Sequence, residues 1–235
     1  MADAEGGRQM SMPFYVSPEQ VMKDRADYAR KGIAQGRSLV ALEYADGIAI
    51  VTENPSRTLF KISEIYDRMA FAGVGKYNEF EMLKIAGIRH ADLKGYSYSR
   101  EDVNARALAN AYAQTVGQVF VHEMKPYEVE ILVAEIGVAP EDDNDLFHIS
   151  YDGRVMDEHG FTVLGGQAET LAEQMQQQYH EGLPARDAIR LATSVLAGTD
   201  RTLTADQLEA AVLDRNLGRR TFRRIGEPEL AAILS

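Results

Sequence analysis

The order of elements that the sequence predicts indicates an α+β fold in which two sheets stack between two layers of helices. Along the chain the apolar pattern changes from helical to strand-like, back to helical, and then through both once more. The run Ile48–Val51 is apolar without interruption. This run predicts burial on both faces, because a strand with one wet face would alternate. The two observations predict a four-layer αββα sandwich with an extra N-terminal helix.

The N-terminal helix is predicted by its start signal. Ser17 is a suitable N-cap, a proline follows in the first turn, and Gln20 is placed to complete a capping box. We therefore expect a helix from Pro18 to about Lys31 that ends at Gly32. Residues 1–16 precede it as a flexible segment, and residues 17–235 are expected to form a single domain.

Four strands are expected next. Asp46-Gly47 lies between two apolar runs and favours the positive φ angles of a tight hairpin turn. Gly73 and Gly75 are expected to interrupt the last of the four strands. The predicted strands are Leu39–Tyr44, Ile48–Val51, Lys61–Tyr66 and Met69–Val74.

Two helices are expected after these strands. Apolar residues at helical spacing predict the first helix from Tyr77 to about Ala86. The second is expected to begin at Ser99, where Asp102 completes a capping signature. It continues through apolar residues four positions apart, namely Leu108, Tyr112, Val116 and Phe120.

The second half of the chain repeats the change from strands to helices. Strands are predicted at Glu128–Val138, Leu146–Tyr151 and Phe161–Leu164, with a turn at Asp152-Gly153. Two helical stripes follow, one through Leu171, Met175 and Tyr179, the other through Ala188, Ile189, Ala192, Val195 and Leu196. Gln207–Leu213 is compatible with helix by propensity, and local pattern alone leaves helix and strand open there. A short terminal helix is expected.

Composition narrows the classes of partner. With 36 acidic and 25 basic residues the chain carries a net charge of −11, which repels a phosphate backbone, so we expect no nucleic acid partner. There is no cysteine, and the start MADAEGGRQM does not have the pattern of a secretion signal. The longest uncharged stretch, Ala107–Val121, is too short to cross a bilayer. A soluble, cytoplasmic protein without a membrane partner is expected.

Motifs for cofactor, metal or nucleophile chemistry are absent from the sequence. Gly73-Val74-Gly75-Lys76 resembles the end of a phosphate-binding loop, but Ala70 stands where the first Walker glycine would be. Gly95–Ser99 is not a nucleophile elbow, because it ends in serine where the G-x-S-x-G motif has glycine. The five histidines share no metal-ligand spacing, and the acidic segment 141–145 lacks the spaced ligands of a calcium loop. We expect no cofactor and no metal. The arginine cluster is interpreted as a solvated or subunit-interface surface: Arg215, Arg219, Arg220, Arg223 and Arg224.

Several blocks, in the same order, resemble the actinobacterial 20S proteasome α subunits. The resemblance covers nearly the whole chain from about Met10, and leaves the nine residues before it unmatched. It implies the Ntn-hydrolase fold, and it makes Leu208–Leu213 a strand. The blocks are SPEQVMKDRADYARKGIA, ENPSR with LFKISEIYDR, GKYNEFE, LANAYAQT, KPYEVE, ISYDG and FRRI.

The same resemblance implies a subunit without catalytic residues. Catalytic proteasome β subunits begin, after processing, with a threonine whose own amine helps activate it; here Arg37-Ser38 stands at that place, behind 36 residues of chain. Without cleavage there is no free amine to act as base. Two alternatives remain open. One is an active N-terminal-nucleophile threonine or serine peptidase subunit, processed to begin at Ser38. The other is a small-molecule enzyme on an unrelated α+β fold.

The resemblance also implies partners and site residues. The partners are a proteasome β subunit, six further copies in a seven-membered α ring, a AAA-type ring ATPase and, indirectly, pupylated protein substrates. Lys61 falls where active subunits keep a catalytic lysine, and Glu53 where they keep an aspartate. In α subunits this lysine lines a pocket for the ATPase C-terminus. Two further sets are implied: a gate of Met10, Ser11, Met12, Pro13, Phe14, Tyr15 and Val16, and a pore annulus of Lys125, Pro126 and Tyr127.

Overall fold

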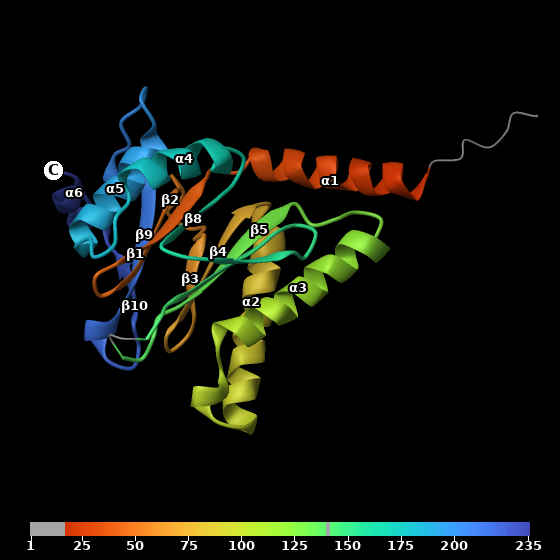
Figure 1. The fold of residues 1–235 in the computed structure, drawn as a ribbon, viewed down its shortest axis with the longest axis horizontal. Coiled ribbons are helices and arrows are strands. Elements are labelled where there is room, and N and C mark those ends of the chain that lie inside the picture. The colour runs from red at the N-terminus through yellow and green to blue at the C-terminus, as the bar shows by residue number, and fades with distance from the viewer. Residues whose placement is uncertain (1–16, 140–141) are drawn as a thin grey trace, which may run out of the picture.

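Two antiparallel five-stranded sheets form the centre of the computed structural model, which describes residues 17–139 and 142–235 (Figure 1). The first sheet has the order β10-β9-β2-β1-β8 and the second β3-β4-β5-β6-β7. The strands of the first sheet are β1 Leu39–Tyr44, β2 Gly47–Glu53, β8 Phe161–Leu164, β9 Leu208–Asp214 and β10 Phe222–Ile225. Those of the second are β3 Ile62–Tyr66, β4 Met69–Gly75, β5 Val129–Glu135, β6 Asp145–Ile149 and β7 Val155–Glu158.

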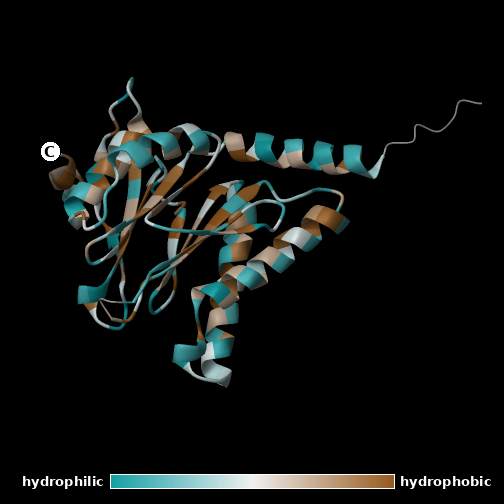
Figure 2. Cartoon of the chain, viewed as in Figure 1, coloured by the Kyte–Doolittle hydropathy of each residue, from teal (hydrophilic) through white to brown (hydrophobic). Residues whose placement is uncertain are grey.

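The helices fall into two layers and one separate element. Helices α2 Tyr77–Ser97 and α3 Ala105–His122 pack on the second sheet, whereas α4 Ala168–Gln178, α5 Ala185–Ala197 and α6 Glu227–Leu234 pack on the first. A third apolar cluster fills the space between the sheets, with members such as Leu39, Ile50 and Leu132. In Figure 2 the strands between the helical layers are largely brown. The predicted four-layer αββα sandwich is therefore confirmed.

Helix α1 Pro18–Ala34 lies at one end of the sandwich, from which it extends outward (Figure 1). Its N-terminus is capped as predicted, because the Ser17 hydroxyl accepts a hydrogen bond from the Gln20 amide at 3.2 Å. Its second half is buried, since Ala29 and Ile33 belong to the apolar cluster between the sheets. Arg25 adds hydrogen bonds to backbone carbonyls at the end of α3. The helix continues beyond the predicted end at Gly32 to Ala34.

The first hairpin differs from its prediction. Its two turn residues are Ala45 and Asp46, while Gly47 already belongs to β2 and pairs with Tyr44. Gly47 does not have a positive φ angle. Glycine is needed there for another reason, because a Cβ atom would lie 1.9 Å from the Leu213 carbonyl oxygen of the neighbouring strand.

The connection between α2 and α3 also differs. The predicted Ser99–Asp102 capping box forms, but it caps only the 3-10 turn Arg100–Asp102. Helix α3 begins later, at Ala105, where the Asn104 side chain accepts a hydrogen bond from the Ala107 amide at 2.9 Å.

Three further features differ from prediction: the end of α2, the place of Gly73 and the presence of β7. Helix α2 runs to Ser97, well beyond the predicted end near Ala86. Gly73 was expected to interrupt β4 but lies inside it; glycine is needed there because a Cβ atom would lie 2.7 Å from the ring of Phe80. Strand β7, with the sequence VMDE, was missed because it is an edge strand without a buried apolar pattern.

Two elements near the C-terminus agree with prediction. The segment left open between helix and strand is β9, an interior strand between β10 and β2, and the short terminal helix is α6. Among the described residues, no helix is long and apolar enough to span a bilayer. The same residues contain no group of three or more potential metal ligands.

Candidate functional site

Lys61 lies immediately before β3, near the end of the sandwich that α1 covers. Its ammonium group donates hydrogen bonds to the carbonyl oxygen of Arg37 at 2.9 Å and that of Glu53 at 3.3 Å. A third, longer bond of 3.4 Å goes to the hydroxyl of Thr52. All three acceptors are neutral, and Lys61 forms no ion pair with a carboxylate in the described part of the chain.

Glu209 fixes the backbone at Lys61. Its carboxylate, almost fully buried on β9, accepts hydrogen bonds from the amides of Lys61 at 2.8 Å and Ile62 at 3.0 Å. It also accepts a bond from the Asn54 side chain at 2.7 Å and pairs with the guanidinium of Arg224. Because β9 and β3 belong to different sheets, this carboxylate joins the two sheets beside Lys61. The sequence offered one signal for it, an acid inside the apolar run LEAAVL.

Burial changes the acidity of Lys61. The pKa of Lys61 is lowered to about 8, mainly through loss of hydration; the negative charge of Glu209 opposes this shift and the positive charge of Arg37 adds to it. The side chain is therefore mostly protonated at pH 7 but titrates within about a unit above it.

Glu53 holds two arginines at the same end of the sandwich. Arg37 pairs with one carboxylate oxygen, and Arg201 lies 3.2 Å from the other. The Glu53 side chain is 11% exposed, whereas those of Arg37 and Arg201 are 50% and 49% exposed. A second bond from Arg201, to the Leu196 carbonyl at 2.9 Å, ties it to the end of α5. These three charges were not predicted to form a cluster, since Arg201 is distant in sequence.

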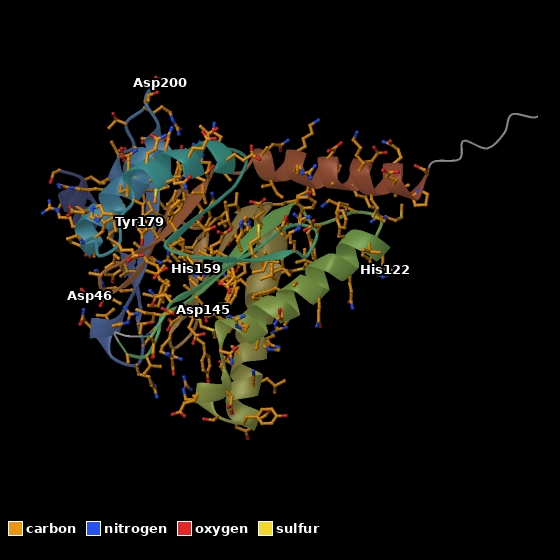
Figure 3. All side chains as sticks on the ribbon, viewed as in Figure 1. Asp46, His122, Asp145, His159, Tyr179 and Asp200 are labelled. Carbon is orange, nitrogen blue, oxygen red and sulfur yellow. The ribbon has the colours of Figure 1, made fainter. Side chains whose placement is uncertain are left out.

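A cavity of about 560 Å³ lies beside the Glu53 cluster. Helix α4 contributes Thr170 and Gln174 to its wall, Gln167 lies just before that helix, and the loop after α5 contributes Asp200. Figure 3 shows Asp200 at the tip of this loop, which stands out from the helical layer. The volume is within the range of ligand sites in proteins.

Ser38 shows no arrangement for nucleophilic catalysis. Its nitrogen is part of the peptide bond to Arg37, so the chain has no free α-amine at that position. Its carbonyl accepts a hydrogen bond from Thr52 at 2.9 Å. Over residues 17–139 and 142–235 its hydroxyl makes no hydrogen bond to Lys61, whose ammonium contacts the carbonyl of Arg37 instead.

The predicted annulus residues form the loop between α3 and β5. The Lys125 ammonium lies 2.6 Å from Glu79 and 2.7 Å from Glu128, and 5.7 Å from the centre of the Tyr28 ring on α1. Partial burial acts against its charge, but the hydrogen bonds with the two carboxylates raise the pKa of Lys125 above its ordinary value. Pro126 is buried and Tyr127 half-buried. The gate residues Met10–Val16 lie outside the described residues.

The C-terminal arginines have partners within the chain. Arg220 pairs with Glu64, Arg223 with Glu229 and Arg224 with Glu209. Arg219 lies 3.7 Å from Asp67, and Arg215 donates to the side chain of Asn144 at 2.8 Å. Each of these cations is already engaged, in keeping with the interpretation of the cluster as a protein surface.

Comparison with known proteins gives one consistent family. A family described as "Proteasome subunit" matches residues 33–213. "Proteasome subunit alpha" of Kineococcus radiotolerans is 58% identical over 235 residues, covering 96% of this chain and 99% of its own. The protein of the same name from Sanguibacter keddieii is 60% identical, covering 96% of this chain and 90% of its own. The protein of that name from Acidothermus cellulolyticus is 58% identical, covering 96% of this chain and 98% of its own.

Proposed function

Because the chain belongs to the proteasome subunit family, with relatives of the α type over nearly its full length, we propose that it forms the outer rings of a 20S core particle. Seven copies make each ring, a β-type partner supplies the threonine peptidase activity, and the particle works in the cytoplasm. The observation that carries the noncatalytic role is Arg37-Ser38 within a continuous chain, where an active subunit needs a free terminal threonine.

Docking of a ring ATPase is the second part of the proposal. Lys61 anchors the terminal carboxylate of an ATPase tail, and the ATPase delivers pupylated proteins. The absence of a carboxylate partner for Lys61 among the described residues supports this role, because an external carboxylate would supply the missing counter-charge. Glu209 supports it too, since it fixes the backbone from which the side chain extends.

Gating is the third part. Residues 10–16, MSMPFYV, close the axial pore by packing against their copies around the ring, and the loop Lys125–Tyr127 forms a narrow annulus beneath them. The ion pairs of Lys125 with Glu79 and Glu128 support a rigid annulus, since they tie the loop to α2 and β5. Contact of Lys125 with the Tyr28 ring connects the loop to the helix that follows the gate.

The docking proposal is tested with Lys61→Ala in the assembled α–β particle. A hydrogen bond to a charged group is worth about 1.5 to 3 kcal/mol, so each tail should bind roughly tenfold to a hundredfold more weakly. Several tails on one ring multiply the loss through avidity. Lys94→Ala, on α2, is the matched control. Equal tail affinity of Lys61→Ala and wild-type particles would reject the pocket, and failed assembly would indicate a structural lysine.

Gating is tested by deleting residues 1–16 from the same particle. We expect faster hydrolysis of short peptides and entry of unfolded proteins, with Lys61→Ala leaving this activity unchanged. A truncated particle that hydrolyses peptides no faster than the full-length one would show that this segment is not the gate.

The noncatalytic role has its own test. The purified chain should not hydrolyse fluorogenic peptides until a β-type partner is added. Turnover by the isolated chain that Ser38→Ala abolishes, at unchanged fold, would establish the alternative of an active peptidase subunit.

A further inference from the structure

Another cavity, of about 810 Å³, lies at the opposite end of β3 from Lys61. Lys61 precedes this strand, whereas Tyr66 at its end and the turn that follows line the cavity. The other walls come from the 3-10 turn after α2, the end of β5 and the segment between β9 and β10. The volume is within the range of ligand sites in proteins.

Arginines outnumber acidic residues around this cavity. The arginines in its lining are Arg68, Arg100, Arg215 and Arg219. The acidic residues are Asp67, Glu101 and Glu135. The lining therefore carries one positive charge in surplus at pH 7.

Two of the acidic residues already have guanidinium partners. Asp67 accepts hydrogen bonds from Arg100 at 2.6 and 3.0 Å. Glu135 accepts one from Arg68 at 2.9 Å, and its other oxygen accepts one from the Ala105 amide at 2.6 Å. Because the carboxylates of the chain balance Arg68 and Arg100, the surplus charge belongs to the two arginines between β9 and β10.

Arg215 and Arg219 have donors left for an external acceptor. Arg215 donates through Nη2 to the Asn144 side chain at 2.8 Å and to the Asp142 carbonyl at 3.2 Å, which are both neutral. Its Nε is buried and, within the described part of the chain, has no hydrogen-bond partner. Such an unpartnered buried donor is rare in folded proteins. Arg219 lies 3.7 Å from Asp67, too far for a hydrogen bond, and is 76% exposed.

We propose that this cavity binds a small carboxylate with an apolar body, and that Arg215 and Arg219 bind its carboxylate group. One surplus charge matches a monoanion, and the planar guanidinium group fits the two oxygens of a carboxylate. Met69, Val103 and Val138 supply an apolar wall for the rest of the ligand. This ligand site goes beyond ring assembly, gating and tail docking, and it does not depend on them.

The experiment compares three eight-carbon probes by isothermal titration calorimetry on the full-length chain at pH 7: sodium octanoate, octanamide and octyl phosphate. Octanoate should bind at least about tenfold more tightly than octanamide, which has the same apolar body without the charge. Octyl phosphate should bind no more tightly than octanoate, because its head group carries more negative charge than the surplus of the site. A titration to about 20 mM covers the affinity expected of a ligand of this size.

Two variants test the arginines separately. Arg215→Gln should weaken octanoate binding about tenfold or more, and Arg219→Gln about threefold to tenfold, because Arg219 is more exposed to solvent. Arg219→Gln removes no hydrogen bond that the described chain makes, so it keeps the test valid if Arg215→Gln does not fold. Arg223→Gln is the matched control, since Arg223 pairs with Glu229 outside the cavity wall, and it should bind octanoate like the wild type.

Three results would overturn the inference. They are equal affinities for octanoate and octanamide, an octanoate affinity unchanged in both arginine variants, and no octanoate binding to the wild type. Tighter binding of octyl phosphate than of octanoate would overturn the assignment to a carboxylate. Gating and tail docking are measured on the assembled particle with other probes, so these results are distinguishable from a failure of the proposed function.

Discussion

Replacing Glu209 with glutamine should destabilise the chain far more than a comparable change at the surface. The buried carboxylate receives two donors on each oxygen: the Lys61 amide and the Asn54 side chain on one, the Ile62 amide and Arg224 on the other. Glutamine keeps the shape but replaces one oxygen with an NH₂ group. In either orientation, two donors then face a donor instead of an acceptor.

The expected magnitude follows from burial. Removing one partner of a buried ion pair typically costs about 3 to 5 kcal/mol. Glu209 is buried and Arg224 is 32% exposed, so we expect a cost near the lower end of that range. Glu64→Gln is the matched control: it carries the same substitution on β3 and also breaks a carboxylate–arginine pair, but Arg220 there is 73% exposed. Pairs of that kind contribute about 0 to 1 kcal/mol.

Urea unfolding of the full-length chain at pH 7, followed by circular dichroism, measures both variants against the wild type. A second readout is the pKa of Lys61, followed by NMR of isotope-labelled lysine. It should fall below its value of about 8 in Glu209→Gln, because the charge of Glu209 raises it. If Glu209→Gln costs no more than Glu64→Gln, Glu209 does not join the sheets as described here.

Three further outcomes are expected. The pKa of Lys61 is lowered from 10.5 to about 8 in the folded chain, so between these two values the unfolded chain binds more protons. The free energy of unfolding should therefore rise between pH 7 and pH 10. Urea unfolding should show that this rise is about 2 kcal/mol larger in the wild type than in Lys61→Met. Gly47→Ala should lower stability by more than about 2 kcal/mol, because its Cβ would lie 1.9 Å from the Leu213 carbonyl; a melting temperature within a degree of wild type would contradict that contact. Gly87→Ala should lower the stability of the folded chain, because its Cβ would lie 1.7 Å from the Tyr112 hydroxyl. The loss of stability should be smaller when Gly87→Ala is made in a Tyr112→Phe background. Equal losses in both backgrounds, measured by thermal melting, would show that the strain arises from another contact.

The layers of the fold were predictable from the sequence because buried helices and strands have apolar residues at regular spacings. Ile48–Val51 is apolar throughout because it lies in β2, between the helices of one layer and the other sheet, and the structure has this strand fully buried. The stripe Leu108, Tyr112, Val116 is the buried face of α3. A partly buried element lacks such a pattern, as in β7, an edge strand of partly buried and exposed residues.

The candidate site was predictable only in part. Lys61 was named through the family resemblance, whereas Arg37 was named only as the residue beside Ser38 at the place of the missing nucleophile. Arg201 and Glu209 were missed because their roles depend on contacts across 148 residues, to Glu53 and to Lys61 respectively, and no local spacing encodes such contacts. The role of Gly47 was misassigned for a similar reason: a Cβ there would collide with β9, which is distant in sequence.

The position of α1 sets an order of events during synthesis. Of the described elements, this helix leaves the ribosome before the surfaces that hold it: the carbonyls of Phe120 and Glu123, and the side chain of Glu128 that lies against Gly32. An isolated helix of 17 residues is only marginally stable in water. At usual elongation rates of 5 to 20 residues per second, the nascent helix waits roughly 5 to 20 s for its docking surface. During that interval the side chains of Ala29 and Ile33 lack their buried environment, so we expect the speed of translation to affect the folding yield.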